Sequence, residues 1–309
     1  MATTTQTTQL IAPAKATGPL ALWHLLSLDA PTVAALWTWF VARASHMRLP
    51  IASPLAMALA VWMLYAADRL LDARLLDAKL LNVSTRGIYP RDQLEARHFF
   101  HHRHRRAFLL GIAFAGMGIA ALLSRLDPAA IRLYLMEGAP LAAWFLILHA
   151  TRSAHRLPKE VAVGLFFSAA IFIPTVARAR DLRTTLGPYA ILFAALCSLN
   201  CLFIYAWEHG QRRPALHEDW PASALPAHAT TRLALAHLKA LAVSIAIAGA
   251  SLAIFHLHPD QRPIAVACSL AAALLLALDR NRTRLSRINL RAAADLALLT
   301  PLLLLPFLR

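Results

Sequence analysis

The sequence carries little charge for its length. Only 15% of its 309 residues are Asp, Glu, Lys or Arg, and 59% are hydrophobic. Soluble domains carry about a quarter charged residues and fewer apolar ones. The mean hydropathy is +0.54. This composition excludes an ordinary soluble domain and predicts an all-α membrane protein that crosses the bilayer several times.

Two further features are missing from the sequence. It lacks the long alternating runs of an outer-membrane β-barrel, and Leu and Ala dominate where β-branched residues would be expected. It also shows no module that binds RNA or DNA. The net charge of +15 therefore indicates basic cytoplasmic loops that contact anionic lipid headgroups. We expect no nucleic acid as a partner.

Cysteine and signal-peptide features are also scarce. The three cysteines, Cys197, Cys201 and Cys268, all lie in apolar segments, and they are too few for a soft-metal site. We expect them to be small buried hydrophobic residues. Residues 1–20 lack a charged region followed by a continuous apolar core, so we expect a short disordered tail and no cleavable signal peptide. Residues 21–309 are predicted to form a single integral-membrane domain.

Apolar runs long enough to cross the hydrocarbon core, which takes about 20 residues with some latitude, can be placed nine times. Several are short, and the first and fifth are the least regular. The predicted spans are Ala30–His46, Ile51–Leu71, Ala107–Leu123, Ile131–His149, Val161–Val176, Pro188–Trp207, Leu233–Phe255, Pro263–Leu278 and Ala292–Leu308.

The distribution of basic residues predicts the orientation of these spans. With a cytoplasmic N-terminus, 21 Lys and Arg residues fall on the inner side and nine on the outer side. Cytoplasmic loops of membrane proteins carry such an excess. We therefore predict a multi-pass protein of a bacterial-type plasma membrane, with its N-terminus inside and its C-terminus outside. The longest inner junction ends in residues 91–106, which predict a helix at the membrane surface.

The acidic stretch 65–79 is the most informative part of the chain. It ends the second predicted span and brings Asp68, Asp72 and Asp77 to the inner mouth of a membrane helix, where carboxylates usually mark a functional site. Asp68 and Asp72 are four residues apart and share one helix face. One interpretation is a site for a divalent metal. The other is a solvated turn paired to Arg69 and the arginine that follows.

A similar pattern ends the sixth predicted span. Tyr205 precedes Glu208 by three residues, as Tyr65 precedes Asp68. Asn200 lies two turns before Glu208 on the same helix face, and its amide oxygen and the carboxylate both suit a hard cation. The matching positions predict two pseudo-equivalent four-helix halves, followed by a last helix.

Nine helices with an acidic motif after the second and a polar motif after the sixth resemble the UbiA superfamily of intramembrane prenyltransferases. The resemblance covers the whole chain in layout and the motifs in part. The family's first motif usually reads NDxxDxxxD. Here Asp68 aligns with its asparagine, Arg69 with its first aspartate and Asp72 with its second. Leu76 takes the last position, and Asp77 follows one residue later.

The second motif and the diphosphate clamp also match only in part. The family's DxxxDxxxD is represented by Asn200, Ile204 and Glu208. Basic residues between the fourth and fifth helices hold diphosphate in this family, and Arg152 and Lys159 are the candidates here. These departures affect the expected activity more than the expected fold.

The resemblance implies a bundle around a central cavity, in which a polyprenyl group moves from its diphosphate to an aromatic or other lipophilic acceptor. Mg²⁺ would neutralise the diphosphate as the allylic C–O bond breaks. Its expected ligands are Asp68, Asp72, Asp77, Asn200 and Glu208.

The remaining expected roles concern phosphate and the allylic cation. Arg69, Arg152 or Lys159 would hold the outer phosphate, and the faces of Tyr65 and Tyr205 would shield the cation. Two other functions stay open: a family member that binds isoprenoid lipids without turnover, and a transporter that uses intramembrane acids. The sequence leaves open the acceptor, the prenyl chain length and the oligomeric state.

Overall fold

The computed structural model describes residues 18–83, 96–151, 158–210, 228–255 and 259–307. This part of the chain is helical and contains no strand. Short 3₁₀ turns connect or end some of the helices. The α-helices are α1 (Pro19–Leu25), α2 (Asp29–Ala44), α3 (Ala52–Val83), α4 (Ala96–Arg103), α5 (Arg105–Leu122), α6 (Pro128–Thr151), α7 (Lys159–Arg178), α8 (Leu182–Gly210), α9 (Ala229–Ala236), α10 (Leu238–Phe255), α11 (Arg262–Arg280), α12 (Arg287–Ala297) and α13 (Pro301–Leu304).

Eight helical segments in the described part of the chain are long and apolar enough to cross a membrane, which makes the chain a multi-pass α-helical membrane protein. They coincide with the second to ninth predicted spans. The segments are Ala52–Leu71, Arg105–Arg125, Pro128–Ile147, Lys159–Arg178, Leu182–Glu208, Leu238–Phe255, Arg262–Arg280 and Ile288–Phe307.

The first predicted span is more complex than the pattern indicated. Helix α2 has 16 residues, which gives a length of roughly 24 Å, less than the hydrocarbon core of about 30 Å. Helix α1 precedes it at a bend of 87°, and the two together can count as one broken span. A ninth crossing therefore depends on this bent pair, and the count of nine stays a prediction.

The acidic stretch continues the second span as helix. Helix α3 has 32 residues, or roughly 48 Å, so its C-terminal third extends beyond the segment Ala52–Leu71 that suits the membrane. Leu, Ala, Arg and Lys dominate that extension, and all four favour helix. The backbone at Asp72 and Asp77 is thus helical, where a solvated turn was the alternative expectation.

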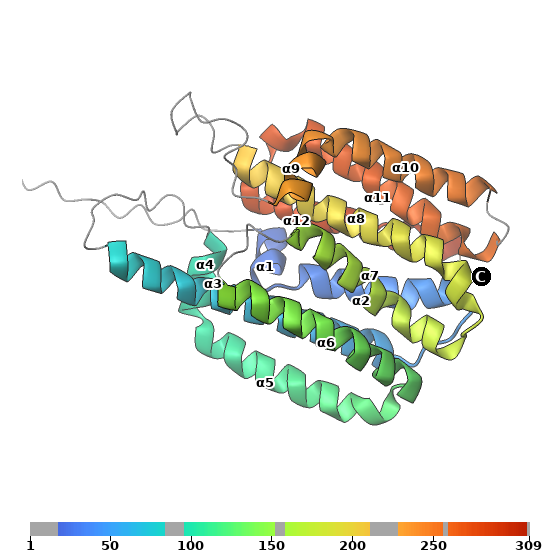
Figure 1. Ribbon diagram of the computed structural model, residues 1–309, viewed down its shortest axis with the longest axis horizontal. Helices are drawn as coiled ribbons and strands as arrows, with labels where there is room; N and C mark the ends of the chain where they lie inside the picture. The colour runs from blue at the N-terminus through green and yellow to red at the C-terminus, as the bar shows by residue number, and fades with distance from the viewer. Residues whose placement is uncertain (1–17, 84–95, 152–157, 211–227, 256–258, 308–309) are drawn as a thin grey trace, which may run out of the picture.

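The helices pack side by side around a core formed by α2, α7, α8, α11 and α12 (Figure 1). Trp37 on α2 and Phe193 on α8 lie at its centre, with ring centroids 4.2 Å apart. Neither side chain is exposed to solvent. By contrast, much of the apolar surface of α5, α6 and α10 is exposed, as expected of helices that face lipid. Helices α1, α4 and α9 lie at one end of the bundle, on the left in Figure 1.

Small residues let the central helices approach closely, as in other membrane bundles. Gly164 on α7 packs against α8, where an added Cβ would lie 2.5 Å from the carbonyl oxygen of Ala194. Gly249 on α10 has the same role against α11, with the carbonyl oxygen of Ala265 at 2.8 Å. Both contacts need a residue without a side chain.

Prolines lie inside several spanning segments, and in two places a neighbouring side chain satisfies a freed carbonyl. Pro174 in α7 has no N–H for the carbonyl of Ala170, and the Tyr134 hydroxyl donates to that oxygen instead, at 3.2 Å. The last segment breaks between α12 and α13, near Pro301. Trp37 Nε1 donates to the Leu298 carbonyl oxygen there, at 2.7 Å.

Other expectations about the architecture either need correction or remain predictions. Residues 1–17 lie outside the described part of the chain, and α1 begins at Pro19. The segment 91–106 was expected to form one helix; over its described part, α4 ends at Arg103 and α5 begins at Arg105. The central cavity and the two pseudo-equivalent halves are not tested by this arrangement of helices.

Candidate functional site

The bend between α1 and α2 is the starting point of the site. Ser27 lies at the bend with φ of 58°, in the left-handed region that a non-glycine residue adopts only under local constraint. Its hydroxyl oxygen lies 3.2 Å from Nε2 of the buried His101 on α4. Trp62 on α3 donates its indole N–H to the carbonyl oxygen of Leu26 at 3.0 Å. Side chains of α3 and α4 therefore hold the bend.

Arg69 of the acidic stretch points into this bend. It is 7% exposed, and its Nη1 donates to the carbonyl oxygen of His24 at 3.0 Å. That carbonyl lies in the last turn of α1, where a cation is favoured. Nη2 lies 3.9 Å from Oδ2 of Asp29, and the Tyr65 ring centroid lies 5.9 Å from the guanidinium carbon.

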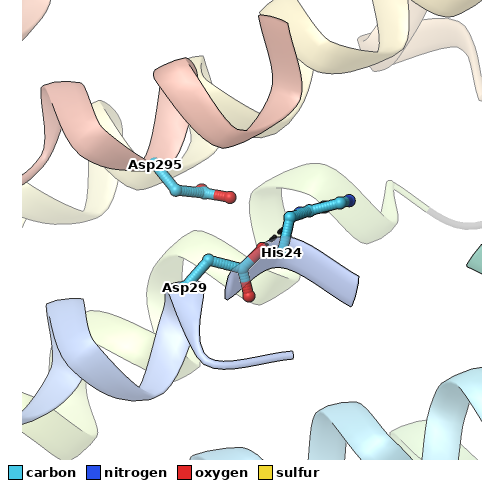
Figure 2. Close-up of side chains that lie close together, drawn as sticks. All are labelled: His24, Asp29 and Asp295. Atoms are coloured by element: carbon cyan, nitrogen blue, oxygen red, sulfur yellow. Dashed lines mark hydrogen bonds and ion pairs between the residues drawn. The ribbon is translucent and has the colours of Figure 1, made fainter. Parts of the chain in front are cut away.

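Asp29 begins α2 and meets two other potential ligand side chains (Figure 2). Its Oδ1 accepts from the backbone N–H of Ala30 at 3.0 Å, and its Oδ2 hydrogen-bonds to Nδ1 of His24. Asp295 extends from α12 toward the same place. One ligand atom from each of His24, Asp29 and Asp295 lies within 4.8 Å of the other two.

The second polar segment reaches α12 through both of its predicted side chains. Nδ2 of Asn200 donates to Oδ1 of Asp295 at 2.9 Å, and Glu208 forms an ion pair with Arg291. The pairs form because Asn200 and Glu208 share one face of α8, as their spacing predicts, while Arg291 and Asp295 are four residues apart on α12.

Five of these side chains form what we call the polar cluster. They come from α1, α2, α3, α8 and α12, so distant parts of the sequence meet at one place. His24, Asp29 and Asn200 are buried, with exposures of 3%, 1% and 5%, and Asp295 is half-buried. The members of the polar cluster are His24, Asp29, Arg69, Asn200 and Asp295.

The structure brings together some of the predicted site residues. Arg69 and Asn200 belong to the polar cluster, and Tyr65 lies beside Arg69. Asp68 and Lys159 are exposed, and Tyr205 is half-buried on α8. The predicted metal-binding role of Asp68 and Glu208 therefore stays a prediction. Side chains that lie outside the described part of the structure are those of Asp72, Asp77 and Arg152.

Three members of the polar cluster were not predicted. Asp295 lies inside the ninth predicted span, and a carboxylate within an apolar span is by itself a signal of function. Asp29 gives a weaker signal, because it immediately precedes the first predicted span. His24 has no comparable signal. It joins the cluster only because the bend folds α1 back toward α12.

The polar cluster combines two carboxylates, an imidazole, an amide and a guanidinium at one end of an apolar bundle. Such a set can bind a cation through oxygen and nitrogen, and its arginine can bind an anion. No protein-family model, curated protein or solved structure matches the chain. The chemistry of the residues is accordingly the basis for assigning a function.

Proposed function

We propose that this protein is an intramembrane prenyltransferase, which transfers a polyprenyl group from its diphosphate to an aromatic or other lipophilic acceptor. One observation carries the proposal. Arg69 from the first acidic segment and Asn200 from the second polar segment both contact the acidic pair formed by Asp29 and Asp295. The two segments that the prenyltransferase resemblance singles out thus meet in space, although no contact between them follows from their positions in the sequence.

The location of the polar cluster suits an amphipathic substrate. It lies where α1 bends into α2, beside apolar helices long enough to span the membrane. A diphosphate would bind at this polar end, and its isoprenoid chain would extend along apolar helix surfaces. Lys159 at the start of α7 is exposed and would reach the outer phosphate as a flexible cation. Tyr65 would present its ring to the allylic carbon.

Magnesium is the metal that the resemblance implies, and the residues fit it in part. Asp68 is exposed on α3, and Glu208 is paired with Arg291. Mg²⁺ usually takes one or two carboxylates together with substrate phosphate, so Asp68 and its neighbours on α3 would hold the ion jointly with the diphosphate. Bound Mg²⁺ supplies charge neutralisation as the diphosphate leaves.

The residues of the chain would contribute orientation and exclusion of water. Arg69 is fixed by the His24 carbonyl and by Asp29, so it offers its charge without a large cost of ordering. Trp207 on α8 donates its indole N–H to Asp279 on α11 at 2.9 Å. This hydrogen bond joins the two helices near this end. The apolar surroundings protect a carbocation from water.

We also propose that the end of the bundle carrying α1, α4 and α9 (Figure 1) faces the cytoplasm of a bacterial-type cell. The excess of basic residues in the junctions at this end supports that orientation. It places the N-terminus inside and the C-terminus outside.

Prenyl transfer by the purified protein in detergent tests the function. Prenyl diphosphates of several chain lengths and aromatic acceptors would be offered with and without Mg²⁺, and release of diphosphate measured. We expect Mg²⁺-dependent release. If no chain length gives release of diphosphate but a prenyl diphosphate binds saturably, the catalytic function is wrong. The protein is then a non-catalytic isoprenoid-lipid-binding protein. The ion pairs that already occupy Arg69 and Glu208 are the observation that favours this alternative.

Lys159→Ala tests the class of substrate. The variant should weaken binding of a prenyl diphosphate and leave binding of the matching prenyl alcohol unchanged, because only the diphosphate offers oxygen atoms to the ammonium group. Loss of one charge-assisted contact should cost about 1.5–3 kcal/mol. Lys239→Ala is the matched control, because Lys239 is also an exposed lysine but lies on α10, where it pairs with Asp279 at 3.8 Å. Equal losses for both ligands would mean that Lys159 only anchors α7.

A further inference from the structure

The acidic pair of the polar cluster leaves a question of charge that prenyl transfer does not answer. Asp29 and Asp295 approach each other inside the protein, although buried carboxylates repel unless a cation or a proton separates them. Arg69, 3.9 Å from Asp29, offsets one negative charge. The hydrogen-bond partner of Asp295 on α8 is the neutral amide of Asn200.

Asn200 supplies a second and independent observation. Its side chain is 5% exposed, and its Oδ1 has no hydrogen-bond partner among the described residues. A buried acceptor without a partner costs about 1–3 kcal/mol, so its retention needs an explanation. The oxygen belongs to the amide group that contacts Asp295, and it therefore lies at the edge of the polar cluster. A cation there would satisfy it.

From these contacts we propose that the protein itself holds one divalent transition-metal cation in the polar cluster, without the help of a diphosphate. The ligand atoms would be Nδ1 of His24, one carboxylate oxygen from each aspartate and Oδ1 of the amide. Residues from four helices would thus form the site: His24, Asp29, Asn200 and Asp295.

The ligand types decide which metal fits. Carboxylate and amide oxygens suit Mg²⁺, Ca²⁺ and Mn²⁺, whereas imidazole suits the transition metals. A set with both types favours Mn²⁺ or Zn²⁺ over Mg²⁺. In the structure, Nδ1 of His24 and Oδ2 of Asp29 form a hydrogen bond, and a metal would take the place of the shared proton, which leaves to solvent. Asp295 is half-buried, so the ion would enter past its side chain.

The metal site shares the polar cluster with the prenyl-transfer proposal but does not rest on it. It would bind metal in the absence of any prenyl diphosphate, whereas the proposed Mg²⁺ would be shared with the substrate. The bound cation would also join α1 and α2 to α12 and α8, so it would stabilise the bend at Ser27. Metal binding should therefore raise the melting temperature of the whole protein.

Mn²⁺ is the probe for this site, because its electron paramagnetic resonance signal distinguishes bound from free ion. Full-length protein in detergent would be stripped with a chelator, dialysed and titrated with Mn²⁺ in the absence of substrate. We expect one saturable Mn²⁺ per chain and at least tenfold weaker binding of Mg²⁺. Asp295→Asn and Asp29→Asn should each weaken Mn²⁺ binding at least tenfold.

Glu160→Gln is the matched control, because Glu160 is a buried carboxylate outside the polar cluster. It is 5% exposed and accepts a hydrogen bond from Thr231. The control should bind Mn²⁺ as the wild type does. If Glu160→Gln weakens binding as much as Asp295→Asn, the effect is general destabilisation and the proposed site is wrong.

A measurement on the wild type covers the case in which the aspartate variants fail to fold. Pulsed electron paramagnetic resonance of bound Mn²⁺ should show coupling to an imidazole nitrogen, and His24→Gln should remove that coupling. Saturable binding without nitrogen coupling, binding only after a prenyl diphosphate is added, or no saturable binding at all would each overturn the proposal. The second of these results would still support the prenyl-transfer function.

Discussion

Arg69 is the residue on which the bend and the acidic pair both depend. Its guanidinium group binds the His24 carbonyl and lies 3.9 Å from Asp29, and it is almost completely buried. A buried charge that keeps its partner contributes little net stability, but removal of the partner is costly, because the remaining charge has no compensation. Arg69 is therefore more important to the fold than a surface arginine would be.

Substitution of Arg69 should expose this dependence. In Arg69→Gln we expect a loss of about 3–5 kcal/mol, since Asp29 loses its cation and the His24 carbonyl loses a charged donor. Thermal unfolding in detergent measures the effect. The exposed Arg106 offers the control Arg106→Gln, with little expected change.

The double variant Arg69→Gln with Asp29→Asn separates the two causes. Neutralising both partners should recover part of the lost melting temperature, because the carboxylate of Asp29 is then no longer left without its cation. If the double variant melts as early as the sum of the single variants requires, Arg69 and Asp29 do not interact energetically.

The sequence predicts some residues of the polar cluster and misses others for a physical reason. The spacing of Asn200 and Glu208 predicts their shared face, because helix geometry determines it locally. The partners of that face, Asp295 and Arg291 on α12, depend on which helix packs against α8. His24 depends on a bend that Trp62 and His101 hold from distant parts of the chain. Local patterns carry no information on such contacts.

At the scale of single helices, the pair α7 and α8 depends on the absence of a side chain at Gly164. A Cβ there would lie 2.1 Å from the Ser198 hydroxyl oxygen and 2.5 Å from the Ala194 carbonyl oxygen. The hydroxyl can rotate away, but the backbone oxygen cannot. The two helices would have to separate.

Gly164→Ala should therefore destabilise the protein. We expect a loss of roughly 1–3 kcal/mol, as in other overpacked cores, and earlier thermal unfolding in detergent. Gly187→Ala on α8 is the matched control, because nothing lies within 4 Å of its added Cβ, and alanine favours helix by about 1 kcal/mol. Equal melting temperatures for the two variants would show that α7 can move.

The proline in α7 gives a second prediction at this scale. The Tyr134 hydroxyl donates to the Ala170 carbonyl oxygen that Pro174 leaves without its helical partner. Tyr134→Phe should cost about 0.6–1.7 kcal/mol, the size of hydrogen bonds between helices in membranes. In a Pro174→Ala background the same substitution should cost almost nothing, because the backbone N–H of the new alanine restores the helical bond. An undiminished cost there would exclude this role for Tyr134.

The helices themselves are the best-predicted feature of the molecule. Eight predicted spans coincide with helices of sufficient length and hydropathy, since a continuous apolar run can satisfy its backbone in a membrane only as helix. The first predicted span also contains a helix, but α2 has only 16 residues, so a ninth crossing depends on counting α1 and α2 as one bent span. Composition alone gives no measure of where a helix bends.

At the scale of the whole molecule, orientation follows from charge. The positive-inside asymmetry predicts that the end with α4 is cytoplasmic and that the short turn between α7 and α8 is outside. Arg103 on α4 and Arg180 in that turn are both exposed, so each position can carry a reporter cysteine. Cys197 and Cys268 are buried and should add little background.

An impermeant thiol reagent applied to intact cells tests the orientation. We expect Arg180→Cys to react and Arg103→Cys to react only after the cells are opened. Labelling of the wild-type protein is the control, because it gives the background from the three native cysteines. The opposite labelling pattern would mean that the predicted orientation is inverted and that the polar cluster lies on the outer side.

The bond between Trp37 and the Leu298 carbonyl has a consequence for synthesis on the ribosome. The two residues are 261 positions apart, and chains grow at about 5–20 residues per second, so the indole waits on the order of tens of seconds for its acceptor. During that time Trp37 lacks the hydrogen-bond acceptor that it has in the complete fold. A chain terminated before α12 would keep an unsatisfied polar group in its apolar interior, which quality-control proteases and chaperones of the membrane can detect.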